Sequence, residues 1–129
     1  KMLDTHLKGY FLCSQAVAKV MVPKKQGVIL NMGSISGFVS MPKGITAYNV
    51  AKAGVHMLTR SMAKELGPYN IRVNAIAPGL IDTNFQEKIE GSTILYTNLL
   101  NRIPIKRLIH KKEVPNYGTM GNSTHLCII

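Results

Sequence analysis

The stretch 27–37, GVILNMGSISG, decides the fold together with the stretch 47–52, AYNVAK. Residues 28–32 are continuously apolar except for Asn31, as expected for a parallel strand that is covered on both faces. The small residues GSISG at 33–37 then predict a turn. A strand that leads through a turn into a helix is the first part of a β–α–β unit.

A helix and a second strand complete this unit. A helix is predicted over 47–66 because apolar residues keep a helical spacing, at Val50, Ala51, Val55, Leu58 and Met62. Gly67 and Pro68 are a typical stop signal for a helix. The run IRVNAIA at 71–77 predicts another strand. Two such strands joined through a helix predict a right-handed parallel crossover.

Another amphipathic helix is predicted over 3–22, before the first strand. Its apolar face is formed by residues at three- and four-residue steps or their multiples, namely Leu3, Leu7, Tyr10, Val17 and Met21. Asp4 or Thr5 lies near the expected start, and Pro23 is expected to end the helix.

Tyr48 and Lys52 are the candidate catalytic pair. Residues four apart on a helix lie on the same face, so the ammonium of Lys52 can lie beside the hydroxyl of Tyr48. An isolated tyrosine hydroxyl is almost wholly protonated at pH 7, and a nearby cation favours its ionised form. Tyr48 is then a usable proton donor or acceptor. A serine after the preceding strand, Ser34 or Ser36, can hold the substrate oxygen, although both serines also suit a turn.

Four pieces of the sequence resemble the short-chain dehydrogenase/reductase family, in the family's order. They are HLKG at 6–9, NMGS at 31–34, YNVAK at 48–52 and NAIAPGLIDT at 74–83. Their wording is most similar to 3-oxoacyl-acyl-carrier-protein reductases and related sugar or alcohol dehydrogenases. The resemblance implies an α/β fold with a partial Rossmann-like, doubly wound parallel sheet, in the order helix, strand, helix, strand and then lid helices.

The resemblance also implies an activity, which is reversible hydride transfer between NAD or NADP and a small-molecule carbonyl or secondary alcohol. Ser34 would hydrogen-bond the carbonyl oxygen, with Ser36 as the alternative. Tyr48 would act as the acid/base and supply the proton. Lys52 would bias Tyr48 toward phenolate and bind the ribose hydroxyls, so both residues would also contact the cofactor.

Further site residues follow from the same resemblance. Pro78, Gly79, Ile81 and Thr83 would border the nicotinamide ring, its carboxamide and the neighbouring phosphate. Such a position agrees with the general rule that parallel sheets bind ligands beyond the carboxyl ends of their strands. His6 stands where the family usually has an asparagine that holds a water in the proton relay. Imidazole can also donate and accept a proton, and the alternative is an interior histidine without a role.

Two parts of a dinucleotide-binding domain do not occur in the sequence. They are the Gly-rich turn after the first strand and the final strand with its glycine-rich segment. We therefore expect the C-terminal half of such an enzyme, with a partial NAD(P)-binding domain over 1–114 and an irregular tail over 115–129. The alternative function is that of a non-catalytic remnant or a helix-mediated interaction module.

Composition argues against several other classes of protein. The net charge is +10, from sixteen Lys and Arg against six Asp and Glu, but the basic residues are scattered and lack the interleaved aromatics of a nucleic-acid platform. No stretch of about 18 apolar residues occurs, so we expect no membrane partner and a cytoplasmic location. The histidines show no metal-ligand spacing, and no metal is expected. In the resembled family, helices corresponding to 3–22 and 47–66 pack against a second subunit, which implies a homo-oligomer.

Overall fold

The computed structural model describes residues 1–40, 45–82, 97, 101, 103, 107–114 and 127–128. The chain divides into two compact units. The first unit comprises Lys1–Gly79 together with Met120–Ile129, and the second comprises Leu80–Thr119.

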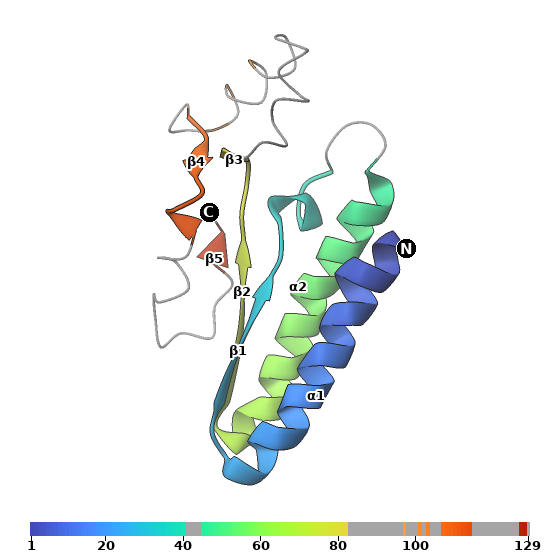
Figure 1. Ribbon diagram of the computed structural model, residues 1–129, viewed down its shortest axis with the longest axis vertical. Coiled ribbons are helices and arrows are strands. Elements are labelled where there is room, and N and C mark those ends of the chain that lie inside the picture. The colour runs from blue at the N-terminus through green and yellow to red at the C-terminus, as the bar shows by residue number, and fades with distance from the viewer. Residues whose placement is uncertain are drawn as a thin grey trace. The chain divides into compact units, whose positions relative to one another are not determined.

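The first unit contains two long helices and a parallel sheet (Figure 1). In chain order its elements are η1 (Asp4–Lys8), α1 (Gly9–Lys24), β1 (Gly27–Met32), η2 (Ile35–Gly37), α2 (Thr46–Leu66), η3 (Gly67–Tyr69), β2 (Ile71–Ala77) and β5 (Cys127–Ile128). The order helix, strand, helix, strand agrees with the order predicted from the sequence.

The sheet has the strand order β1-β2-β5, and both of its pairings are parallel. In the β1–β2 pair, Gly27 lies opposite Ile71 and Met32 lies opposite Ile76. Parallel neighbours need a long connection between them, and here that connection contains α2. The predicted α/β fold with a parallel sheet is confirmed, and the carboxyl ends of β1 and β2 meet at one edge.

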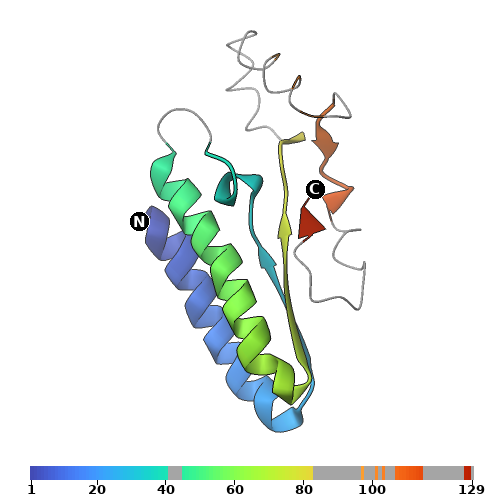
Figure 2. The same cartoon turned by 180° about the vertical axis from the view of Figure 1, so that it is seen from behind.

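Helices α1 and α2 lie on the same face of the β1–β2 pair, as both views show (Figures 1 and 2). The burial of β1 therefore alternates, with Ile29 and Asn31 buried and Val28, Leu30 and Met32 exposed. The expectation that this strand is covered on both faces is wrong for the part of the chain that the structure describes. A continuous apolar run is typical of a strand covered on two sides, but the described helices cover β1 on one side only.

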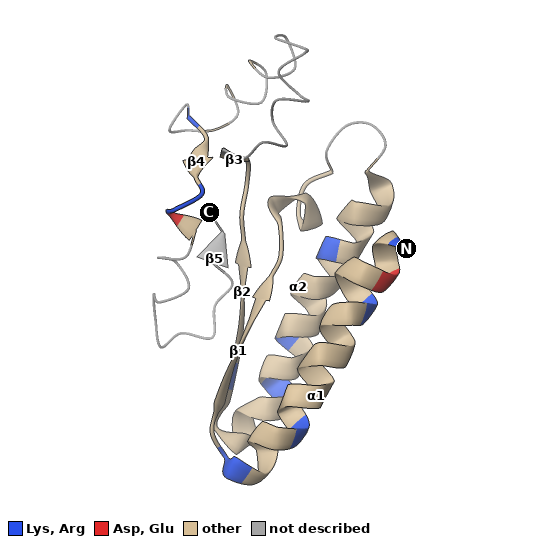
Figure 3. Cartoon of the chain, viewed as in Figure 1, with Lys and Arg blue, Asp and Glu red and all other residues tan. Residues whose placement is uncertain are grey.

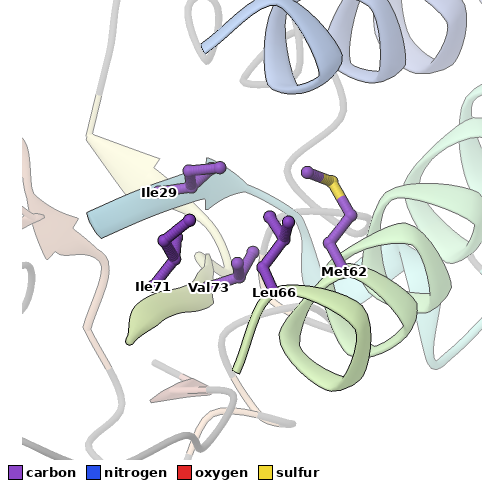
Figure 4. Packing of buried hydrophobic residues seen from close by; sticks show 5 residues of the cluster. All are labelled: Ile29, Met62, Leu66, Ile71 and Val73. Atoms are coloured by element: carbon purple, nitrogen blue, oxygen red, sulfur yellow. The ribbon is translucent and has the colours of Figure 1, made fainter. Parts of the chain in front are cut away.

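The hydrophobic core lies between α2 and the two strands. Its side chains point toward one another in Figure 4 and come from β1, α2 and β2, namely Ile29, Met62, Leu66, Ile71 and Val73. Val55 of α2 is also fully buried. Burying each such side chain stabilises the fold by roughly 1.5–3 kcal/mol, so this contact fixes α2 against the strands.

The first helix runs past its predicted end. Met2 and Leu3 are already helical, a π-helical stretch, Asp4–Lys8, follows, and the helix continues as α1 to Lys24, so Pro23 lies inside it. A proline in the last turn removes only one backbone hydrogen bond, and the left-handed Lys25 (φ 48°) then ends the helix. Helix α2 ends at Leu66, where the Gly67-Pro68 signal predicted its end.

The second unit contains two short strands, β3 (Ile81–Asp82) and β4 (Ile109–His110), which pair in parallel. In the same unit Arg107 forms a bidentate ion pair with Glu113, in which two guanidinium nitrogens donate to the two carboxylate oxygens at 2.9 and 3.0 Å. This hydrogen bonding lowers the pKa of the Glu113 carboxyl to about 2. Most of the predicted lid region, 84–108, lies outside the described residues.

Strand β5 was not expected, because it falls in the segment 115–129 that was predicted to be irregular. Its two residues pair with Ile76 and Ala77 of β2. A strand edge offers unpaired backbone groups to any extended segment, and a pair of residues is too short to show a periodicity in the sequence. The other residues of 115–129 lie outside the described part.

Lysine and arginine residues are distributed along both helices of the first unit rather than gathered in one stretch (Figure 3). Among the described residues, no helix combines the length and the apolar character that crossing a membrane requires.

Candidate active site

One face of α2 carries the polar side chains that reach the end of β1. Tyr48, Lys52, His56 and Thr59 follow one another at steps of four, four and three residues, so they lie along one side of the helix. Lys52, His56 and Thr59 are almost fully buried, at 4%, 3% and 4% exposure. Each of the three makes a hydrogen bond to the stretch 31–34.

Lys52 is held by the backbone of β1. Its ammonium donates a hydrogen bond of 2.7 Å to the carbonyl of Met32, the last residue of that strand. The ammonium also lies 5.6 Å from the ring centre of Tyr48 and 5.2 Å from the ring centre of Tyr10. Burial lowers the pKa of Lys52, because desolvation disfavours the charged amine. The structure thus brings the predicted pair Tyr48 and Lys52 together around a fixed cation.

Tyr48 and His6 are in contact. Their rings meet edge to face, with centroids 5.6 Å apart and an angle of 80° between the planes. Both residues are partly buried. His6 belongs to the π-helical stretch η1, and this stretch packs against α2.

Tyr10 also belongs to the site, and the sequence analysis placed it only on an apolar helix face. It faces the ammonium of Lys52, and burial raises the pKa of its hydroxyl, with a further contribution from Tyr48. The sequence could have indicated this position, because Tyr10 lies four residues after His6 and the two side chains therefore share one helix face.

Ser34 lies at the start of the short helix η2, in an extended conformation (φ −168°, ψ 152°). Its Oγ accepts a hydrogen bond of 3.2 Å from the backbone N–H of Ser36, and the residue is 8% exposed. A hydroxyl that accepts one hydrogen bond can still donate its own proton. Of the two candidate serines, Ser34 is therefore the one whose hydroxyl is fixed by the turn.

The turn is joined to the end of β2. The backbone N–H of Gly33 donates to the carbonyl of Ile76 at 2.7 Å, and that of Ile35 donates to the carbonyl of Pro78 at 3.0 Å. Ser34 and the predicted cofactor residue Pro78 therefore lie at the same edge of the sheet, as expected, and Gly79 follows directly.

The structure does not join the other two predicted cofactor residues, Ile81 and Thr83, to this edge of the sheet. Ile81 belongs to β3 of the second unit, and Thr83 is outside the described residues.

His56 is a second residue that the sequence analysis did not place in the site. Its Nε2 accepts a hydrogen bond of 3.3 Å from the backbone N–H of Ser34, and its ring stacks on Phe38 at 4.2 Å between centroids. Burial, and then the positive charges of Arg60 and Lys52, lower the pKa of the imidazole. The sequence could have indicated this position, because His56 lies four residues after Lys52 and therefore on the same face of the helix.

Known proteins resemble this chain in sequence and in structure. The model of the family described as enoyl-(acyl carrier protein) reductase matches residues 1–120. The chain is 42% identical over 115 residues to a galactitol 2-dehydrogenase of Rhizobium johnstonii, covering 88% of this chain and 45% of the relative. It is 40% identical over 113 residues to a 3-oxoacyl-(acyl-carrier-protein) reductase of Synechocystis sp., covering 88% and 43%.

Among solved structures, NAD+-bound xylitol dehydrogenase is similar, with a TM-score of 0.88 and 26% identity. The alignment covers 98% of this chain and 56% of that protein. The chain thus spans about half the length of the curated relatives that it matches. The family match over most of the sequence and the shared parallel α/β architecture show that this chain belongs to the short-chain dehydrogenase/reductase family.

Proposed function

We propose that this chain carries the acid/base and nicotinamide-end residues of an NAD- or NADP-dependent oxidoreductase. Its substrate would be a small molecule with a carbonyl group or a secondary alcohol. The names of the similar proteins support this class, because dehydrogenation of galactitol or xylitol and reduction of a 3-oxoacyl group interconvert a hydroxyl and a carbonyl.

The single observation that carries the proposal is the buried ammonium of Lys52 between Tyr48 and the end of β1. The Met32 carbonyl holds this cation beside the ring of Tyr48. In the proposed reaction Tyr48 exchanges a proton with the substrate oxygen, which is the task of a general acid or base, and Lys52 assists it.

Ser34 is proposed to bind the same substrate oxygen. Its Oγ is oriented by the N–H of Ser36, so its own proton is available to donate. A fixed donor aimed at an oxygen that gains negative charge stabilises the transition state. Ser36 is the alternative if the substrate approaches from farther along the turn.

A nicotinamide cofactor fits the part of the site that this chain supplies. When bound, the nicotinamide provides or accepts the hydride. Lys52 has three N–H donors and uses one on Met32, so others remain for ribose hydroxyls. Pro78 lies at the edge of the sheet beside the Ser34 turn. Pro78, Gly79, Ile81 and Thr83 are proposed as cofactor-binding residues from their place in the sequence motif. The sequence does not contain the Gly-rich turn that would hold the pyrophosphate.

His6 is proposed to continue the proton path from Tyr48. An imidazole that meets the tyrosine ring edge to face, in a partly exposed stretch, can pass a proton between the site and water. Replacement by asparagine would retain a polar group there, so His6→Asn is expected to keep more activity than His6→Leu.

The test of the proposal is a comparison of two tyrosine variants in the full chain. Turnover of NADH or NADPH is measured with a panel of small ketones and, in reverse, secondary alcohols. Tyr48→Phe is expected to lower kcat by about 10²- to 10⁴-fold, the usual contribution of a positioned acid or base. Tyr69→Phe, an exposed tyrosine in η3, is the matched control and should leave kcat unchanged. Equal activity of the two variants would remove Tyr48 from the mechanism.

The second candidate function is a non-catalytic module that associates through its helices. It is favoured by the large apolar side chains that α1 and α2 leave exposed, namely Phe11, Leu12, Val17, Val20, Val50 and Met57. Both candidates predict a homo-oligomer through α1 and α2. They differ in turnover, so sedimentation analysis and the cofactor assay on the same sample separate them. An oligomer that oxidises neither NADH nor NADPH supports the module.

A further inference from the structure

We propose that His56 is a positioning residue for Ser34, because its neutral imidazole occupies the inside of the turn 33–37 and holds the Ser34 backbone in place. The proposal rests on the function proposed above, in which the Ser34 hydroxyl binds the substrate oxygen. His56 acts through Ser34 and is not itself assigned a contact with substrate or cofactor.

The turn is folded closely around the imidazole. A Cβ atom added to Gly33 would overlap His56 Nε2, and one added to Gly37 would lie 2.8 Å from His56 Nδ1. Phe38, the residue after the turn, stacks on the imidazole ring at 25° between the planes. Glycines at both ends of the turn are thus needed for the backbone to approach the ring.

The hydrogen bond to His56 holds the residue that matters most for the site. The N–H of Gly33 is bound by Ile76, that of Ile35 by Pro78 and that of Ser36 by the Ser34 hydroxyl. The N–H of Ser34 is instead bound by the side chain of His56. This bond fixes the backbone of Ser34. The Ser34 hydroxyl is held separately, by the backbone N–H of Ser36.

The bond requires the neutral imidazole, and the surroundings favour that form. An Nε2 atom that accepts a hydrogen bond carries no proton, so the neutral ring carries its proton on Nδ1. The nearby charged groups are Lys52 and Arg60, both cations on α2, whereas the turn and Phe38 have no ionisable side chain. A proton added to Nε2 would point at the Ser34 N–H and break the contact.

The test begins with a measurement that does not depend on activity. Backbone amide hydrogen exchange and histidine side-chain ¹⁵N NMR are recorded for the wild-type chain and three variants. His56→Leu removes the acceptor, His56→Gln places an amide oxygen near the position of Nε2, and Thr59→Val is the matched control. Thr59 is also buried on α2 and also bonds to β1, but through Asn31.

The expected result is selective. Wild-type His56 should be the Nδ1–H tautomer, and the Ser34 amide should exchange about tenfold faster in His56→Leu, as expected for one lost hydrogen bond. The amides of Gly33 and Ile35 should keep their protection in that variant. His56→Gln should restore slow exchange at Ser34, and Thr59→Val should change exchange at Ser34 no more than it changes exchange at Gly33 and Ile35. An Nε2–H tautomer, or unchanged Ser34 exchange in His56→Leu, overturns the proposal.

Kinetics then test whether the position of Ser34 matters for the reaction. His56→Leu is expected to lower kcat by about 10- to 100-fold with little change in KM, because small displacements of a reacting group have effects of this size. In a Ser34→Ala background the same change should cost less than about twofold, because residues that act as one unit are not additive. Additive losses, or no rescue by His56→Gln, overturn the positioning role.

The two proposals fail in different ways. If the wild-type chain shows no turnover, the proposed function fails, and the exchange experiment still decides whether His56 holds the Ser34 turn. If turnover is present but His56→Leu behaves like Thr59→Val in both measurements, the role of His56 fails and the proposed function stands.

Discussion

The side-chain ammonium of Lys52 is bonded to the backbone carbonyl of Met32 at 2.7 Å, and this carbonyl belongs to the last residue of β1. The bond joins the N-terminal third of α2 to the carboxyl end of a strand, so the cation of the candidate site has a position set by the fold. The neighbouring ring of Tyr48 lies one helical turn earlier on α2.

Removing this cation should abolish activity with little loss of stability. Lys52→Met keeps the apolar stem and is expected to lower kcat at least 100-fold, because the proposed acid/base Tyr48 loses its neighbouring cation. Lys52→Met loses the hydrogen bond to Met32 but also removes the cost of burying a charged ammonium. The two effects oppose each other, so the free energy of unfolding should change by less than about 1.5 kcal/mol. Lys64→Met, an exposed position of α2, is the control for both kinetics and urea unfolding.

The choice between the two candidate serines can be tested directly. Ser34→Ala should lower kcat by about 10²- to 10³-fold, as expected when one donor to a developing oxyanion is lost. Ser36→Ala keeps the backbone N–H that orients Ser34, so its kcat should remain close to that of the wild type. The opposite order of the two effects in steady-state kinetics would assign the substrate oxygen to Ser36.

The close approach of the turn to His56 predicts a large effect of one methyl group. Gly33→Ala would force a Cβ atom into the imidazole and should lower the free energy of unfolding by about 1–3 kcal/mol. Gly67→Ala is the control, because nothing lies within 4 Å of its added Cβ and the residue has a helical φ of −52°. This control should be neutral or slightly stabilising. Equal losses in urea unfolding would contradict the packing described for the turn.

The buried hydrogen bond between Asn31 and Thr59 should appear as a coupling between β1 and α2. The Asn31 amide donates to Thr59 Oγ1 at 3.0 Å, and both side chains are buried. Thr59→Val leaves the amide without this acceptor and should destabilise the fold by about 1–3 kcal/mol. Asn31→Leu combined with Thr59→Val should recover part of that loss, since neither polar group is then left unpaired. Strict additivity in a double-mutant cycle would argue against the bond.

The stability of the chain should fall on mild acidification, through His56. Burial, Arg60 and Lys52 lower the pKa of His56 below its ordinary value of 6.5, so the native state binds fewer protons than the unfolded state below that pH. The free energy of unfolding should therefore decrease as the pH falls from 6.5 toward the native pKa. His56→Leu should flatten this dependence in urea titrations at several pH values. An unchanged slope in that variant would exclude His56 as its source.

The sequence predicted most of the fold because its elements have strong local signals. The helical spacing of the apolar residues placed the start of α2 within one residue of the observed one, and the Gly67-Pro68 signal placed its end. The run 71–77 coincides with β2. Pro23 misled the prediction of the helix end, because a proline is tolerated in a last turn. The exposed face of β1 was not predicted, because an apolar run does not reveal whether other elements of the chain cover one face of the strand or both.

The site was predicted in part for a related reason. Tyr48, Lys52 and Ser34 are carried by motifs that can be recognised locally, and the structure ties Lys52 and the Ser34 turn to one helix. Tyr10 and His56 have no motif of their own, because their roles depend on contacts with residues far along the chain. The bond from Ser34 to His56, for example, joins positions 22 residues apart.

The three hydrogen bonds from α2 to the end of β1 also bear on the order in which the chain folds. They join residues 20, 22 and 28 positions apart. Loops of this length close within microseconds, so these contacts can form with the first docking of helix on strand. The chemistry of the site and the earliest tertiary structure of the protein would then arise in the same kinetic step.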